Sequence, residues 1–146
     1  MVDDLRHFTD KERSAMDDQD RERIEKIIHD RKKAHRYLLD NSKVYRSFVE
    51  MEQKTYSDGE LEKKYKELIA IGISILINCE SCLEWHIKQA LDSGATEGQI
   101  IEAIEVGIEM GGGPATVSSR FALKVLDYYR EKDGKGQAPT FYSHNP

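Results

Sequence analysis

The chain has few of the residues that stabilise small secreted proteins. Its 146 residues include two cysteines, three prolines and one tryptophan, and aromatic residues make up 8%. Two cysteines that lie only three positions apart cannot build a network of disulfides, so the pair argues against a secreted disulfide scaffold and for a metal or redox pair. The scarcity of proline leaves long segments free to form helices.

Long hydrophobic runs and a targeting segment are also missing. The longest apolar run, Leu68 to Ile77, is about ten residues, whereas a helix needs ~20 to cross a bilayer. This run predicts a buried core helix and no membrane association. The polar, acidic residues 1–10 contain no apolar stretch of the signal-peptide kind, so we expect a cytoplasmic protein.

An excess of positive charge is absent as well. The formal net charge is -5, and lysines and arginines are interleaved with aspartates and glutamates, so we expect no nucleic-acid partner. Charged residues make up 34% and hydrophobic residues 38%, and segments with strand-like alternation are hard to find. This balance predicts an all-α fold.

The apolar spacing predicts one helical domain over residues 17–131, between a polar N-terminal segment, 1–16, and a C-terminal tail, 132–146, that is mobile or packs on a partner chain. The expected helices cover residues 17–39, 44–56, 60–77, 80–92, 96–110 and 114–131.

Particular residues mark where these helices begin and end. Gly59 and Gly94 are expected to stop helices, and Asn78 is expected to cap the helix that follows it. Thr96 and Gln99 have the spacing of a capping box. The run Gly111-Gly112-Gly113 must break a helix. It lacks the lysine and strand context of a phosphate loop, so it indicates a tight helix connection or a close approach of subunits.

Three side chains that could take part in redox chemistry are expected on one face of the helix that begins near Asn78. At about 100° per residue, Cys79, Cys82 and His86 lie within a wedge roughly 60° wide. The first helical turn holds both cysteines, and its free N–H groups and dipole favour a thiolate. His86 is four residues from Cys82 and seven from Cys79, so a contact with the imidazole favours Cys82.

Glu67 is the last charged residue before the apolar run, and an acid at the edge of a core needs a partner. If the chain reverses near Asn78, Glu67 lies ~16 Å before the turn and His86 ~12 Å after it, at similar depth on neighbouring helices. Glu67, His86 and Cys82 would then form a carboxylate–imidazole–thiol relay. The alternative is a surface acid paired with a nearby lysine, Lys63 or Lys64.

A series of motifs runs through residues 44–130. The motifs are Lys66-Glu67-Leu68-Ile69-Ala70, Cys79-Glu80-Ser81-Cys82 with His86, Ala90, Gly94-Ala95-Thr96, Ile101-Glu102-Ala103-Ile104 and Met110-Gly111-Gly112-Gly113-Pro114. In this series the chain resembles the cysteine-containing, alkylhydroperoxidase D-like branch of the carboxymuconolactone decarboxylase superfamily. The resemblance implies a helical bundle that assembles into homotrimers or homohexamers. It also implies a Glu–His–Cys relay at Glu67, His86 and Cys82, with Cys79 as the second thiol.

Together these features predict a thiol–disulfide redox enzyme of alkylhydroperoxidase type, an antioxidant peroxidase or disulfide reductase. Its substrate would be a peroxide or a disulfide, its reductant an external dithiol protein, and it would need no cofactor and no metal. Peroxidase members tend to carry a histidine directly before the second cysteine, where this chain has Ser81. The alternatives are a non-catalytic oligomer that senses redox state, a zinc module, for which a second pair of ligands is missing, or inert buried thiols. Trp85 and Met110 are expected to be core or subunit contacts.

Overall fold

A computed structural model describes residues 16–134 of the chain. Over this range it contains helices joined by short turns and no strand, which confirms the all-α prediction. The helices are α2 (Asp18–Asn41), α3 (Lys43–Thr55), α4 (Lys63–Leu76), α5 (Glu80–Asp92), α6 (Glu97–Gly111) and α7 (Gly113–Lys132). The predicted segment 1–16 and most of the predicted tail 132–146 lie outside the described residues.

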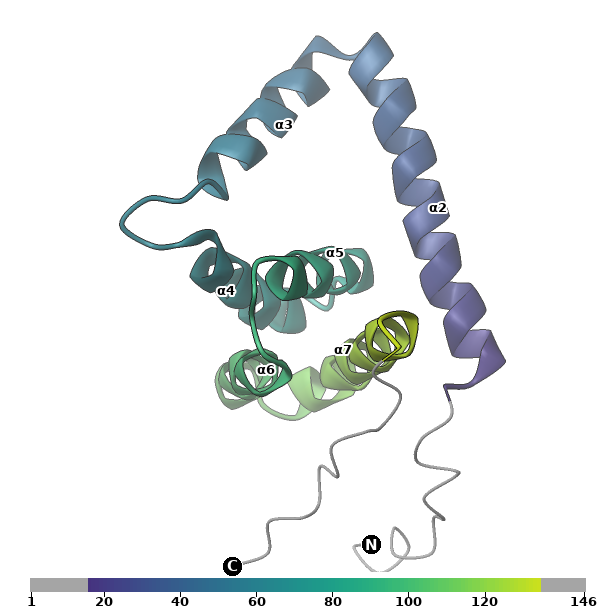
Figure 1. The fold of residues 1–146 in the computed structure, drawn as a ribbon, viewed down its shortest axis with the longest axis vertical. Helices are drawn as coiled ribbons and strands as arrows, with labels where there is room; N and C mark the ends of the chain where they lie inside the picture. The colour runs from purple at the N-terminus through teal and green to yellow at the C-terminus, as the bar shows by residue number, and fades with distance from the viewer. Residues whose placement is uncertain (1–15, 135–146) are drawn as a thin grey trace, which may run out of the picture.

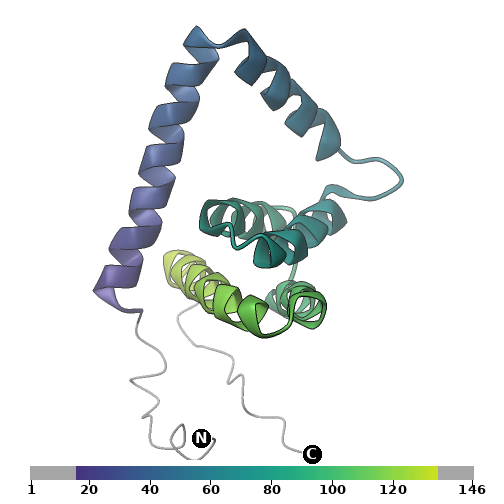
Figure 2. The same cartoon turned by 180° about the vertical axis from the view of Figure 1, so that it is seen from behind.

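Helices α4 to α7 form a bundle, in which α4 packs against both α5 and α6 while α7 crosses α5 and α6 (Figures 1 and 2). Its interior is filled by apolar side chains from all four helices. Fully buried examples are Ile71, Ile75, Leu83, Ile87, Ile100, Ala122 and Val125. The bundle therefore has a continuous hydrophobic core, which is the main source of stability in a domain of this size.

Two glycines let α4 and α6 approach closely. A Cβ atom on Gly107 would lie 2.9 Å from the carbonyl oxygen of Gly72 and 2.9 Å from the side chain of Ile75. Real Cβ atoms do not approach other atoms so closely, so the packing of these two helices depends on the missing side chain.

The predicted ends of α6 and α7 are present. Thr96 and Gln99 form both hydrogen bonds of the capping box. Gly112 has a φ of 66°, in the left-handed region, and it separates helix α6 from helix α7. Gly94, just after α5, has a φ of 85°. Glycine is needed at both places because side chains disfavour this conformation.

Two predicted boundaries are wrong. Cys79, rather than Asn78, is the N-cap of α5, and Asn78 has a left-handed φ of 52° that makes the corner between α4 and α5. Gly59 does not end α3, because the helix stops at Thr55 with Tyr56 as its C-cap. Asparagine tolerates the left-handed region, so it suits the corner as well as a cap.

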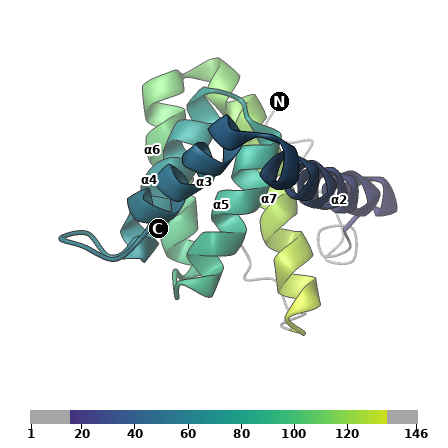
Figure 3. The same cartoon turned by 90° about the horizontal axis from the view of Figure 1, so that it is seen from above.

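Helices α2 and α3 form an arm with a sharp bend between them, and this bend lies away from the bundle (Figures 1 and 2). In the view from above, α3 lies in front of the bundle (Figure 3). The first part of α2 runs beside α5 and α7, whereas α3 packs only against α2 among the described helices. In these two helices Ile24 is the only buried residue. None of the helices within residues 16–134 is long and apolar enough to span a membrane.

Candidate active site

The cysteine pair sits at the corner between α4 and α5, which several hydrogen bonds fix. The N–H of Cys79 donates to the carbonyl of Ser74 over 3.1 Å, and the hydroxyl of Ser118 donates to Oδ1 of Asn78 over 2.9 Å. The second bond ties the corner to α7. The position of the pair is thus set by three helices of the bundle.

Cys79 and Cys82 are joined by a disulfide, with their Cα atoms 5.2 Å apart. Both residues are half-buried. The backbone N–H of Cys82 donates to Sγ of Cys79 over 3.2 Å, so this sulfur caps the first turn of α5. After reduction, the same N–H and the helix dipole stabilise negative charge on that sulfur.

Glu67 and His86 meet across the α4–α5 interface. Nδ1 of His86 lies 2.7 Å from Oε2 of Glu67, and Glu67 is 1% exposed. This is the contact that helix geometry predicts, and it replaces the surface pairing with Lys63 or Lys64. Lys63 instead donates to Oε1 of Gln89.

This contact defines which nitrogen of His86 can take up a proton. A carboxylate accepts hydrogen bonds, so the imidazole donates its Nδ1–H to Glu67 and keeps Nε2 as the basic nitrogen. His86 lies four residues after Cys82 within α5, so the two side chains occupy the same face on successive turns. The arrangement supplies a thiol, a base and a carboxylate that orients the base.

Tyr56 is a neighbour of the relay that the sequence did not reveal. Its ring lies 5.2 Å from the imidazole of His86, measured between centroids. Burial, followed by the negative charges of Glu67 and Glu52, raises the pKa of the Tyr56 phenol. The sequence Tyr56-Ser57-Asp58-Gly59 suggested only a turn, and no spacing rule links it to His86, thirty residues further along the chain.

A second buried acid lies on α5, on another side of the helix. Glu84 is 0% exposed, and it accepts hydrogen bonds from the guanidinium of Arg31 and the hydroxyl of Tyr129. The guanidinium also lies 4.9 Å from the ring centroid of Trp85, so Trp85 contacts the arm. Among residues 16–134, no three His, Cys, Asp or Glu side chains gather so that they could hold a metal ion.

A family model confirms the resemblance seen in the motifs. The model of the carboxymuconolactone decarboxylase family matches residues 42–125, a range that contains the three relay residues and Cys79. The chain belongs to the carboxymuconolactone decarboxylase family. The matched range begins at the N-cap of α3 and ends within α7, so it covers α3 and most of the bundle but not α2.

Two bacterial proteins are similar to this chain over about half of its length. Uncharacterized protein 4 in the cox locus of Paracoccus denitrificans is 42% identical over 77 residues, which are 53% of this chain and 69% of that protein. An uncharacterized protein of Cupriavidus necator is 40% identical over 72 residues, which are 49% of this chain and 61% of that protein.

Solved structures of family members have the same fold. A Thermotoga maritima protein is 25% identical and superposes with a TM-score of 0.71, covering 76% of this chain and 98% of its own. A second crystal structure of that protein describes it as a candidate for a role in an antioxidative response. A Legionella pneumophila member is 26% identical with a TM-score of 0.64, covering 75% of this chain and 96% of its own.

Proposed function

We propose that this protein is a thiol–disulfide redox enzyme in which Glu67 and His86 activate Cys82. The observation that carries the proposal is the bond of 2.7 Å between Nδ1 of His86 and the buried carboxylate of Glu67. A buried acid that orients an imidazole beside a cysteine has the arrangement of a nucleophile activated by a general base.

The proposed cycle begins with reduction of the Cys79–Cys82 disulfide by an external dithiol, which becomes a disulfide itself. His86 then takes the thiol proton of Cys82. The Cys82 thiolate attacks the terminal oxygen of a peroxide, the O–O bond breaks, and Cys82 becomes a sulfenic acid as the alcohol or water leaves with a proton. Cys79 attacks this sulfur, water leaves, and the disulfide re-forms.

The same pair can also reduce a disulfide substrate, because a thiolate attacks sulfur by the same kind of exchange. With Ser81 rather than histidine before Cys82, both substrate classes belong to the proposal. The resemblance further implies that the enzyme works as a homotrimer or homohexamer, and the composition favours the cytoplasm. These two points remain predictions.

Dithiol-driven consumption of hydrogen peroxide or cumene hydroperoxide tests the proposal. We expect Cys82→Ser to abolish turnover and His86→Asn to lower its rate by roughly 10²- to 10⁴-fold, the contribution typical of a general base. Glu67→Gln should lower the rate less, because the imidazole remains. The matched control is His29→Gln, which changes an exposed histidine on α2.

A protein that is oxidised once and does not turn over would instead be a redox sensor. The proposal also fails if Cys82 has an ordinary thiol pKa near 8.5 and His86→Asn leaves its alkylation rate unchanged. In that event the imidazole does not act on the thiol.

A further inference from the structure

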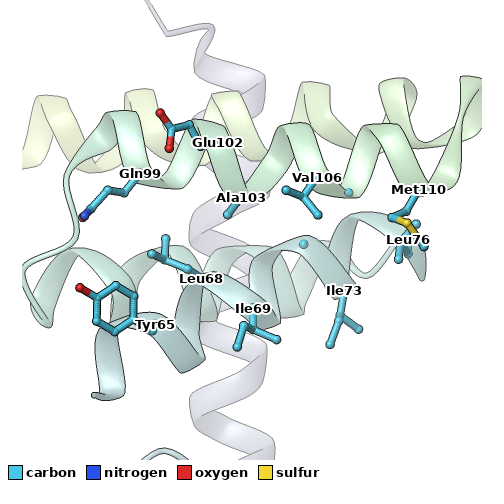
Figure 4. A pocket seen from close by; sticks show the side chains of 12 residues that line it. Tyr65, Leu68, Ile69, Ile73, Leu76, Gln99, Glu102, Ala103, Val106 and Met110 are labelled. Atoms are coloured by element: carbon cyan, nitrogen blue, oxygen red, sulfur yellow. The ribbon is translucent and has the colours of Figure 1, made fainter. Parts of the chain in front are cut away.

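A hollow lined by residues of α4 and α6, and by neither cysteine, lies between these two helices (Figure 4). It is a groove of about 500 Å³. Residues that line it include Tyr65, Ile69, Ile73, Leu76, Val106 and Met110. Ile69, Ile73, Val106 and Met110 are each at least half exposed. A monomer rarely leaves so many large apolar side chains in contact with water at one place.

The shape of the groove comes from the close approach of α4 and α6. Small residues, Gly72, Ala103 and Gly107, lie along the line where the helices meet, and larger side chains rise on both sides in Figure 4. From Tyr65 to Leu76 the groove follows eleven residues of α4, about 16 Å. A depression of this length between two helices accepts the side chains of a third helix.

The arm carries an apolar surface without a partner. Val44, Phe48 and Met51 are 82%, 52% and 57% exposed, and their spacing puts them on one stripe of α3. The stripe is about 10 Å long, so it fits within the groove. No other described helix covers it, because α3 packs only against α2 within residues 16–134.

Charges of opposite sign lie beside the two surfaces. Helix α6 contains glutamates and no lysine or arginine, and Glu102 lines the groove without an ion-pair partner in the described part of the chain. Lys43 and Lys54 flank the stripe on one side of α3, also without ion-pair partners in the described part of the chain, and Glu52 flanks it on the other side. Opposite charges beside an apolar contact favour one orientation of docking.

We propose that α3 of a second copy of this chain docks in the α4–α6 groove, with Phe48 and Met51 inserted over Gly72 and Gly107. This assigns the contact surfaces of the homo-oligomer that the proposed function expects. The docking does not depend on the thiol chemistry, so its failure would leave the redox proposal standing. One copy supplies both an arm and a groove, which makes the contact self-complementary between copies.

Sedimentation velocity on the full chain tests the docking. Phe48→Glu damages the arm and Val106→Glu damages the groove, and both positions are exposed, so the fold should be retained. We expect the wild type to associate and each variant to associate more weakly by about tenfold or more. Met51→Glu and Ile73→Glu repeat the test on the same two surfaces if either variant unfolds.

An equimolar mixture gives the decisive measurement. Phe48→Glu keeps an intact groove and Val106→Glu keeps an intact arm, so the mixture should form a one-to-one complex that neither variant forms with itself. The matched control is Tyr37→Glu, an exposed position on α2 outside both surfaces, which should associate like the wild type.

Four results would overturn the proposal. The first is a monomeric wild type, and the second is normal association of Phe48→Glu, which groove-to-groove packing or another occupant of the groove would give. The third is the absence of a complex in the mixture, and the fourth is a loss of association in Tyr37→Glu equal to that of the other variants.

Discussion

The bundle and the arm are both helical, yet different forces hold them in place. The bundle buries a continuous apolar core and closes over small residues where α4 and α6 meet. The arm buries only Ile24 among its described residues, and four ion pairs join α2 to the helices α5 and α7. The relay residues Glu67 and His86 belong to the bundle, where packing fixes side chains most firmly.

Two ion pairs with the same residue types show how burial changes the contribution of an ion pair to the free energy of unfolding. Arg31 binds Glu84, whose side chain is 0% exposed, whereas Arg23 binds Glu80 at 2.6 Å with side chains that are 53% and 33% exposed. Both pairs join α2 to α5. A buried carboxylate depends on its partner, while an exposed one is solvated without it.

The largest expected effect is therefore the loss of Arg31. Arg31→Met leaves the Glu84 carboxylate buried with only the Tyr129 hydroxyl, and we expect it to lower the free energy of unfolding by about 3–5 kcal/mol. Arg23→Met is the matched control and should cost at most about 1 kcal/mol. Urea denaturation followed by circular dichroism measures both. Equal losses of unfolding free energy would show that burial does not change the contribution of the two ion pairs.

The pH dependence of stability should differ between the bundle and the arm. Burial, and then the hydrogen bond to Glu84, raise the pKa of Tyr129 well above its ordinary value of 10.0. The folded protein thus keeps a proton that the unfolded chain releases. This contribution is fully present below pH 10 and is lost as the pH rises above it, at about 1.4 kcal/mol per pH unit.

Where α2 contacts α7, the hydrogen bond from Arg21 lowers the pKa of Glu131 below 4.5. Its stabilisation is present above pH 4.5 and is lost as the pH falls through the lowered pKa. The side chain of Glu131 is 31% exposed, so the loss should be smaller than that at Tyr129. Denaturation from pH 3 to 11, with Tyr129→Phe and Glu131→Gln as reference variants, measures both. An alkaline slope that survives in Tyr129→Phe would contradict the assignment.

The smallest expected effect concerns Tyr56, the residue by which the arm reaches the relay. Removing its ring should let the imidazole of His86 move, so Tyr56→Ala should slow alkylation of the reduced Cys82 by about three- to tenfold, the range given by one aromatic contact. Tyr56→Phe keeps the ring and should react nearly like the wild type. The rate, followed against pH, separates this positioning role from a structural one, because loss of stability alone would not shift the pKa of the thiol. If Tyr56→Ala matches the wild type, the arm does not contribute to the relay.

Local rules were enough for many features of this chain. Thr96, Gln99, Gly94 and Gly112 act within a few residues of their own positions, so the sequence places them well. Asn78 and Gly59 show the limit of such rules. Each residue suits more than one turn, and contacts with distant segments, such as that of Ser118 with Asn78, decide which one forms.

The candidate site divides in the same way. The sequence alone determined that Cys82 and His86 share one face of α5, because the 3.6-residue period of a helix fixes that relation, whereas Cys79 lies at the N-cap before the helix. It also limited Glu67 to the depth of His86, although only the packing of α4 on α5 brought their atoms to 2.7 Å. Tyr56 and the Arg31–Glu84 pair were decided by tertiary structure, since their partners come from helices whose relative positions no local pattern specifies.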